Sequence, residues 1–126
     1  MPDTVAQFAD AKYLNLETFR KTGAGVQTPV WFAQPPGQAL FYIYSEADAG
    51  KVKRIRNNPQ VRVAPCNFRG RLRGEWVEAQ ARICGPEESA KGQQLLCRKY
   101  GLLKAAGDFF ARMAGHKNTL LAIEFA

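Results

Sequence analysis

The sequence predicts one mainly β domain over residues 1–126, an antiparallel barrel with a few peripheral helices. Three observations predict this fold class. Short apolar segments with strand character recur along most of the chain, and turn residues separate them. Helical patterns are confined to a few places, and no repeat or low-complexity segment interrupts the order. Short strands at this spacing are typical of a small antiparallel barrel.

The first two segments predict a short helix followed by a hairpin. Residues 4–11 can form one or two helical turns. Residues 13–21 have a mixed strand pattern, with Leu14 and Leu16 on one face. The following Gly23-Ala-Gly25 lacks the third glycine and the helix of a dinucleotide fingerprint, so we interpret it as a hairpin turn and not as a phosphate loop.

The next two segments predict strands in different environments. Residues 27–33 contain Pro29, which indicates an edge or a bulge because proline has no N–H to donate to a central ladder. Residues 39–44 form the most apolar segment and have bulky residues on both faces. This pattern indicates a strand buried on both sides, in a barrel or beneath a partner subunit.

The most informative segment is a short cationic helix predicted over residues 48–59. Asp48 is the expected N-cap, and Pro59 pushes the residue before it out of the helical region. Val52 and Ile55 are expected to face the core. Cations near a helix N-terminus oppose the helix dipole, so an anionic ligand there would remove the conflict; a solvated basic face is the alternative. The cations are Lys51, Lys53, Arg54 and Arg56.

Two further strands and a basic loop follow this helix. Residues 60–64 alternate apolar and polar side chains, and residues 75–84 do the same. The loop at 67–74 carries three arginines next to aromatic residues, which could bind nucleic acid; a solvated hairpin loop is the favoured interpretation. The side chains of the second strand that we expect to face inward are Val77, Ala79, Ala81 and Ile83.

The end of the chain predicts helices and a closing strand. Pro86 and the carboxylates after it are favourable at a helix start, and this helix should end at about Tyr100, before Gly101. A second helical pattern covers 102–113. Residues 120–125 then return as a strand.

Composition excludes several classes of function. The apolar segments are far shorter than the roughly 20 residues that cross a bilayer, and the N-terminus lacks the pattern of a signal peptide. We therefore expect a cytoplasmic protein without a membrane partner. The cysteines Cys66, Cys84 and Cys97 form no CxxC pair, and His116 is the single histidine. A disulfide framework, a metal site and a catalytic triad are thus not expected, and no residue stands out as catalytic.

A formal charge of +7 favours anionic partners, which include phosphorylated cofactors, nucleic acids and acidic surfaces. Composition does not choose among them. A cofactor that supplied the chemistry would explain why catalytic side chains are missing.

Several motifs, in their order along the chain, resemble a known family. They are Thr28-Pro-Val-Trp-Phe32, residues 50–61, Ala64-Pro-Cys66, residues 69–74 and Lys99-Tyr-Gly101. Over about residues 11–126 the chain resembles the pyridoxamine 5'-phosphate oxidase-like (PPOX) split β-barrels, which have an FMN-binding-like fold. Within them it resembles the branch of oxidoreductases that depend on the deazaflavin coenzyme F420.

The resemblance implies a homodimer with cofactor sites at the subunit interface. Lys51 matches the lysine of the family that binds phosphate, with Lys53 and Arg54 as further candidates. The strand residues Thr28, Pro29, Val30 and Trp31 would lie beside the ring system of the cofactor. The FMN oxidases have an arginine at Thr28 and a lysine at Ala33, and their serine-arginine-lysine trio corresponds here to residues 49–51. These departures favour F420, with its polyglutamate tail, over FMN and argue against oxidation of vitamin B6.

The expected function is therefore hydride transfer between F420, or FMN, and a small organic substrate. A carrier or sensor that binds flavin, F420 or haem without turnover is the alternative. A nucleic-acid-binding barrel is the third and least favoured reading.

Overall fold

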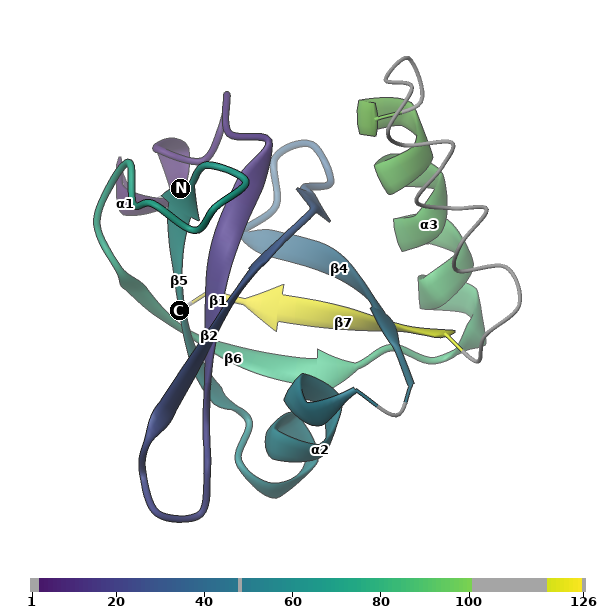
Figure 1. Cartoon of the computed structure of the whole chain (residues 1–126). Helices are drawn as coiled ribbons and strands as arrows, with labels where there is room; N and C mark the ends of the chain where they lie inside the picture. The colour runs from purple at the N-terminus through teal and green to yellow at the C-terminus, as the bar shows by residue number, and fades with distance from the viewer. Residues whose placement is uncertain (1–2, 48, 101–117, 126) are drawn as a thin grey trace.

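The computed structural model describes residues 3–47, 49–100 and 118–125. Ten elements are present in this part of the chain (Figure 1). They are α1 (Asp3–Ala6), β1 (Tyr13–Phe19), β2 (Gly25–Val30), β3 (Phe32–Ala33), β4 (Leu40–Glu46), α2 (Gly50–Asn57), β5 (Gln60–Cys66), β6 (Val77–Ile83), α3 (Pro86–Tyr100) and β7 (Asn118–Glu124).

The seven strands form one antiparallel sheet in the order β2-β1-β5-β6-β7-β4-β3. The strands β2 and β3 lie at the two ends of this order, although only Trp31 separates them in the chain. The sheet must therefore curl until its two edges meet at Trp31. Figure 1 shows the curled sheet. The result is a barrel whose two edges are joined by the chain itself, and this confirms the predicted fold class.

The sequence predicted one strand at 27–33, and this prediction is wrong in detail. The segment divides into two strands because β2 pairs with β1 whereas β3 pairs with β4. Pro29 lies on β2, which is an edge strand, as its missing N–H predicted. The hairpin at 23–25 is confirmed: Gly23 has a φ of 90° and donates its N–H to the carbonyl of Arg20 at 2.8 Å.

Two apolar clusters lie on the two faces of β4. Phe41 and Ile43 belong to the core inside the barrel, whereas Tyr42 packs beneath α3. Two-sided burial of this strand is thus confirmed, and α3 provides the outer cover. At Gly92 a Cβ atom would collide with the Leu120 side chain, so the helix approaches the sheet as closely as its backbone permits.

Several details of the predicted elements differ in the structure. The N-cap of α2 is Ala49, which offers no side-chain hydrogen bond, and the expected cap Asp48 lies outside the described residues. Ala79 and Ala81 are buried as expected, but Ile83 is 36% exposed because β6 ends there. The helical pattern at 102–113 falls outside the described residues. Among the helices described, none is long and apolar enough to span a membrane.

Candidate functional site

The helix α2 is held against the barrel by its apolar side, and this fixes where its cations lie. Val52 and Ile55 are buried in the barrel core, as the sequence predicted. On the same helix the half-buried Arg54 donates a hydrogen bond from Nε to Oγ1 of Thr18 at 2.6 Å. Thr18 lies on β1 and is only 1% exposed. The guanidinium is therefore held in place between α2 and the end of β1.

Three cations gather at this end of β1, and we call Arg20, Lys51 and Arg54 the cationic cluster. Arg20 lies two residues beyond Thr18, so its side chain leaves the strand on the same face. Burial lowers the pKa of Arg54, and the charge of Arg20 lowers it further. Burial also lowers the pKa of Lys51, followed by the charge of Arg54, while Glu46 has a smaller opposite effect. The cluster therefore has uncompensated positive charge that a bound anion would neutralise.

The structure brings only some of the expected site residues together. Thr28 pairs with Leu16 and Val26 pairs with Thr18, so Thr28 shares the face of the hairpin on which the cationic cluster lies. Pro29 is opposite Asn15 on the other face. Lys53 is exposed on the far side of α2 from the buried residues. The two other expected residues, Val30 and Trp31, are half-buried, and Val30 packs against the barrel core.

Sequence reasoning missed Arg20. Its alternation with Thr18 along β1 could have placed the two side chains on one face. However, nothing in the sequence indicated that α2 would pack beside that face.

Trp31 occupies the point where the two edges of the barrel meet. Its ring stacks on Tyr100 with centroids 4.4 Å apart and an interplanar angle of 10°. The Tyr100 hydroxyl accepts the N–H of Phe32 at 3.1 Å, and the carbonyls of Lys12 and Phe32 lie 2.7 and 2.9 Å from the same oxygen. Burial raises the pKa of Tyr100, so the hydroxyl stays protonated and can donate to one of these carbonyls. The end of α3 thereby ties β3 to the residue that precedes β1.

Lys99 lies next to the hydrogen bonds of Tyr100. Its ammonium is 3.5 Å from the ring centroid of Phe32, in a cation–π contact. Burial of the ammonium lowers the pKa of Lys99 to about 8, although much of the side chain is exposed. Part of the lysine population is thus neutral at mildly alkaline pH.

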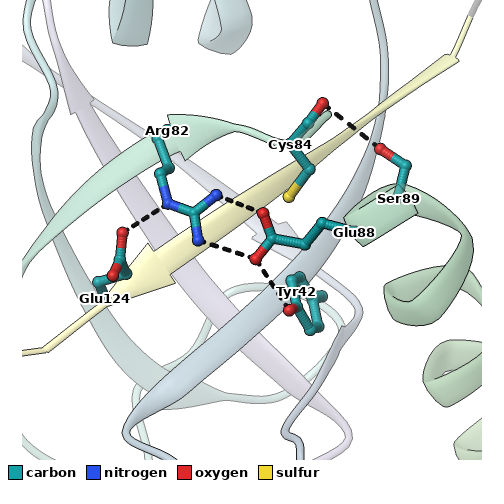
Figure 2. A network of polar contacts seen from close by, with 6 residues as sticks. All are labelled: Tyr42, Arg82, Cys84, Glu88, Ser89 and Glu124. Carbon is teal, nitrogen blue, oxygen red and sulfur yellow. Dashed lines mark hydrogen bonds and ion pairs between the residues drawn. The ribbon is translucent and has the colours of Figure 1, made fainter. Parts of the chain in front are cut away.

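A second charged group joins the start of α3 to the sheet (Figure 2). We call its members, Tyr42, Arg82, Glu88 and Glu124, the charge-balanced network. Arg82 on β6 makes a two-pronged ion pair with Glu88 of α3, and its Nε donates to Glu124 of β7 at 2.6 Å. The Tyr42 hydroxyl donates to Glu88 at 3.0 Å. Arg82 lowers the pKa of Glu88 to about 2, whereas burial and Glu88 raise the pKa of Tyr42 to about 12. Cys84 lies beside Glu88, and burial raises the pKa of its thiol to about 12.

The network has the character of a structural contact. Each of its charges has an opposite charge within hydrogen-bond distance. Within the ranges described, no group of three or more histidine, cysteine or acidic residues is placed to hold a metal ion.

Comparison with known proteins shows similarity at the level of structure. No family model matches the chain, and no curated protein matches it. A conserved hypothetical protein of Mycobacterium tuberculosis superposes with a TM-score of 0.71 at 20% identity, covering 98% of this chain and 79% of that one. The heme storage protein HutZ of Vibrio cholerae gives 0.67 at 15% identity, with 97% and 87% covered.

A third solved structure carries a family description. This Clostridium acetobutylicum protein, related to general stress protein 26 and described as of the pyridoxinephosphate oxidase family, gives a TM-score of 0.66 at 11% identity, with 98% and 80% covered. At sequence identities of 20% or less, the similarity concerns the fold alone. The chain has the split-barrel fold of the PPOX-like and general stress protein 26-like proteins.

Proposed function

We propose that this chain is an oxidoreductase of the split-barrel class that binds coenzyme F420, or FMN as the second choice. The whole of residues 1–126 would act as one domain in a cytoplasmic homodimer, with the cofactor at the subunit interface. The bound cofactor supplies hydride transfer to or from a small organic substrate. The residues of the chain bind its anionic part, orient its ring and exclude water.

The observation that carries this proposal is the cationic cluster. Burial and the charge of Arg20 lower the pKa of Arg54, while burial and the charge of Arg54 lower the pKa of Lys51, which Glu46 offsets only in part. Such a group of donors fits a phosphate or a chain of carboxylates, which accept charge-assisted hydrogen bonds from several cations at once. The multiple charges of a polyglutamate tail match the cluster better than one phosphate does. Residues 28–30 on the adjacent strand β2 would lie beside the ring.

The position of β2 supports the interface. Among the described strands, β2 pairs with β1 alone, so its other edge is available to a second copy of the chain. The same edge carries Thr28, which lies on the face of the cluster. A cofactor bound there would contact both subunits.

The test is a fluorescence titration of the purified protein with F420 and, separately, with FMN. A charge-assisted contact contributes about 1.5–3 kcal/mol, so Lys51→Ala should weaken the binding of the true cofactor by about tenfold or more. Arg56→Ala is the matched control, because Arg56 is an exposed cation on the same helix. Equal effects of the two substitutions, or unchanged affinity in Lys51→Ala, would remove the cluster from the site.

A carrier or sensor that binds its cofactor without turnover is the second candidate. The likeness to a heme storage protein supports it, because that protein has the same fold. Steady-state oxidation of reduced F420 or FMN with a panel of quinone and unsaturated acceptors separates the two functions. Turnover with any acceptor supports the enzyme; tight binding of haem without turnover supports the carrier.

A further inference from the structure

A hollow lies apart from the cationic cluster, at the opposite end of β1. It is a cavity of about 460 Å³ between the segment that follows α1, the start of β1, the end of β5 and the loop that follows β5. None of the residues of the cationic cluster lines it. Its volume is within the range of roughly 300–1,000 Å³ that small-molecule sites occupy.

The walls of this cavity are fixed by hydrogen bonds. Gln7 donates from Nε2 to the carbonyl of Glu75 at 2.9 Å and accepts the N–H of Glu75 at 2.9 Å. The Asn67 side chain accepts the N–H groups of Arg69 and Arg71 at 2.9 and 3.0 Å. The two walls, the α1 region and the loop, are therefore held together before any ligand arrives.

The sides of the cavity combine aromatic, apolar and cationic groups. Tyr13 and Phe68 provide rings, and Phe68 is 63% exposed, which is unusual for so large an apolar side chain. Lys12 and Arg73 provide two positive charges against the single carboxylate of Asp10. The net charge of the lining is thus positive.

Cys66 completes the apolar floor. Burial raises the pKa of its thiol to about 11, so it lies in the cavity as a neutral group and not as a reactive thiolate.

We propose that this cavity binds a small flat organic anion, an aromatic ring that carries one carboxylate, sulfonate or phosphate group. The ring packs between Tyr13 and Phe68, and the anionic group reaches Lys12 and Arg73. This site goes beyond the proposed function, since it shares no residue with the cationic cluster and needs no cofactor. It also accounts for the exposure of Phe68, which a ring bound in the cavity would cover.

Isothermal titration calorimetry of the purified protein tests the site with two matched probes, 2-naphthoate and the neutral 2-naphthamide. The anion should bind at least about tenfold more tightly than the amide, as a charge-assisted contact requires. Arg73→Gln should remove most of this preference, and Phe68→Ala should weaken both probes. Asp10→Asn should tighten naphthoate binding about two- to threefold, a gain that damage to the fold cannot produce.

The controls separate this site from the general positive charge of the protein and from the cofactor site. Arg56→Gln removes the same charge from an exposed position on α2 and should leave naphthoate binding unchanged. Lys51→Ala should also leave it unchanged, so failure here and failure of the proposed cofactor site are distinguishable. Equal affinity for the two probes, no binding of either, or equal losses in Arg73→Gln and Arg56→Gln would overturn the proposal.

Discussion

Two charged groups of this molecule have opposite organisation. In the charge-balanced network, Arg82 lies between Glu88 and Glu124 and contacts both (Figure 2). In the cationic cluster, Arg54 lies near Arg20 and Lys51, and Glu46 offsets the effect on Lys51 only weakly. Both groups connect a helix to the sheet. Only in the first are the charges paired with opposite charges; in the second, Arg54 contacts the neutral hydroxyl of Thr18.

The difference indicates which group is built for the fold and which for a ligand. Opposite charges within hydrogen-bond distance stabilise each other, whereas like charges held together oppose folding. A protein retains such unfavourable charge where a function needs it, and perturbed pKa values accordingly concentrate at functional sites. Removing one charge from each group tests this difference.

Glu88→Gln should have the largest effect on stability. The substitution removes the ion pair with Arg82 and leaves that guanidinium with Glu124 alone. We expect the free energy of unfolding at pH 7 to fall by about 1–2 kcal/mol, with the partial exposure of Arg82 keeping the loss modest. Urea unfolding measures it. Glu87→Gln, the same change at an exposed neighbour, should have little effect; equal losses would show that the network does not stabilise α3.

The same carboxylate should make stability depend on acid pH. The pKa of Glu88 is about 2 in the folded protein, below its ordinary value of 4.5. A lowered folded pKa contributes stability that is present above about pH 4.5 and is lost as the pH falls toward 2. The difference in unfolding free energy between the wild type and Glu88→Gln should therefore shrink over this window. A difference that stays constant from pH 5 to pH 2 contradicts the assignment.

Arg20→Gln should stabilise the fold, in contrast to Glu88→Gln. Removing one of three like charges relieves repulsion, so the free energy of unfolding should rise by up to about 0.5 kcal/mol at low ionic strength. The gain should disappear in about 1 M salt, where the charges are screened. Cofactor affinity should fall at the same time. Lys21 is an exposed cation one residue further along, so Lys21→Gln is the control for net charge. A loss of stability in Arg20→Gln would argue against repulsion within the cationic cluster.

The smallest effect should come from inorganic phosphate. An anion that binds the folded state stabilises it by mass action, so millimolar phosphate should raise the Tm of the wild type by about 1–2 °C relative to chloride at equal ionic strength. The rise should be absent in Lys51→Ala and present in Arg56→Ala. A rise of the same size in all three proteins would mark a general salt effect.

The strands and helices could largely be predicted from local pattern. Alternation located β5 and β6, a mixed strand pattern located β1, and the bulky residues on both faces of β4 predicted its two-sided burial. The errors fall where a neighbouring element decides the outcome. The segment at 27–33 divides at Trp31 because its two halves pair with different strands, and Ile83 is exposed because β6 ends at that residue.

The candidate site could be predicted only in part. Lys51 and Arg54 were identifiable from a concentration of charge along one helix, which is a local property. Arg20 is more than thirty residues away in the chain and joins them only because Val52 and Ile55 hold α2 beside the end of β1. Lys53, equally cationic in sequence, lies on the exposed side of the helix. The assignment of Thr28, Pro29, Val30 and Trp31 to a ring site stays a prediction.

Local pattern was enough to predict the class of fold, the position of the cationic helix and most of the residues that face the core, because periodicity and turn chemistry act over a few residues. Which charges lie together follows from the packing of elements that are distant in the chain. Arg82 lies between two carboxylates, whereas Arg54 lies near two other cations, because contacts across the barrel depend on how strands and helices pack and not on their separation along the chain.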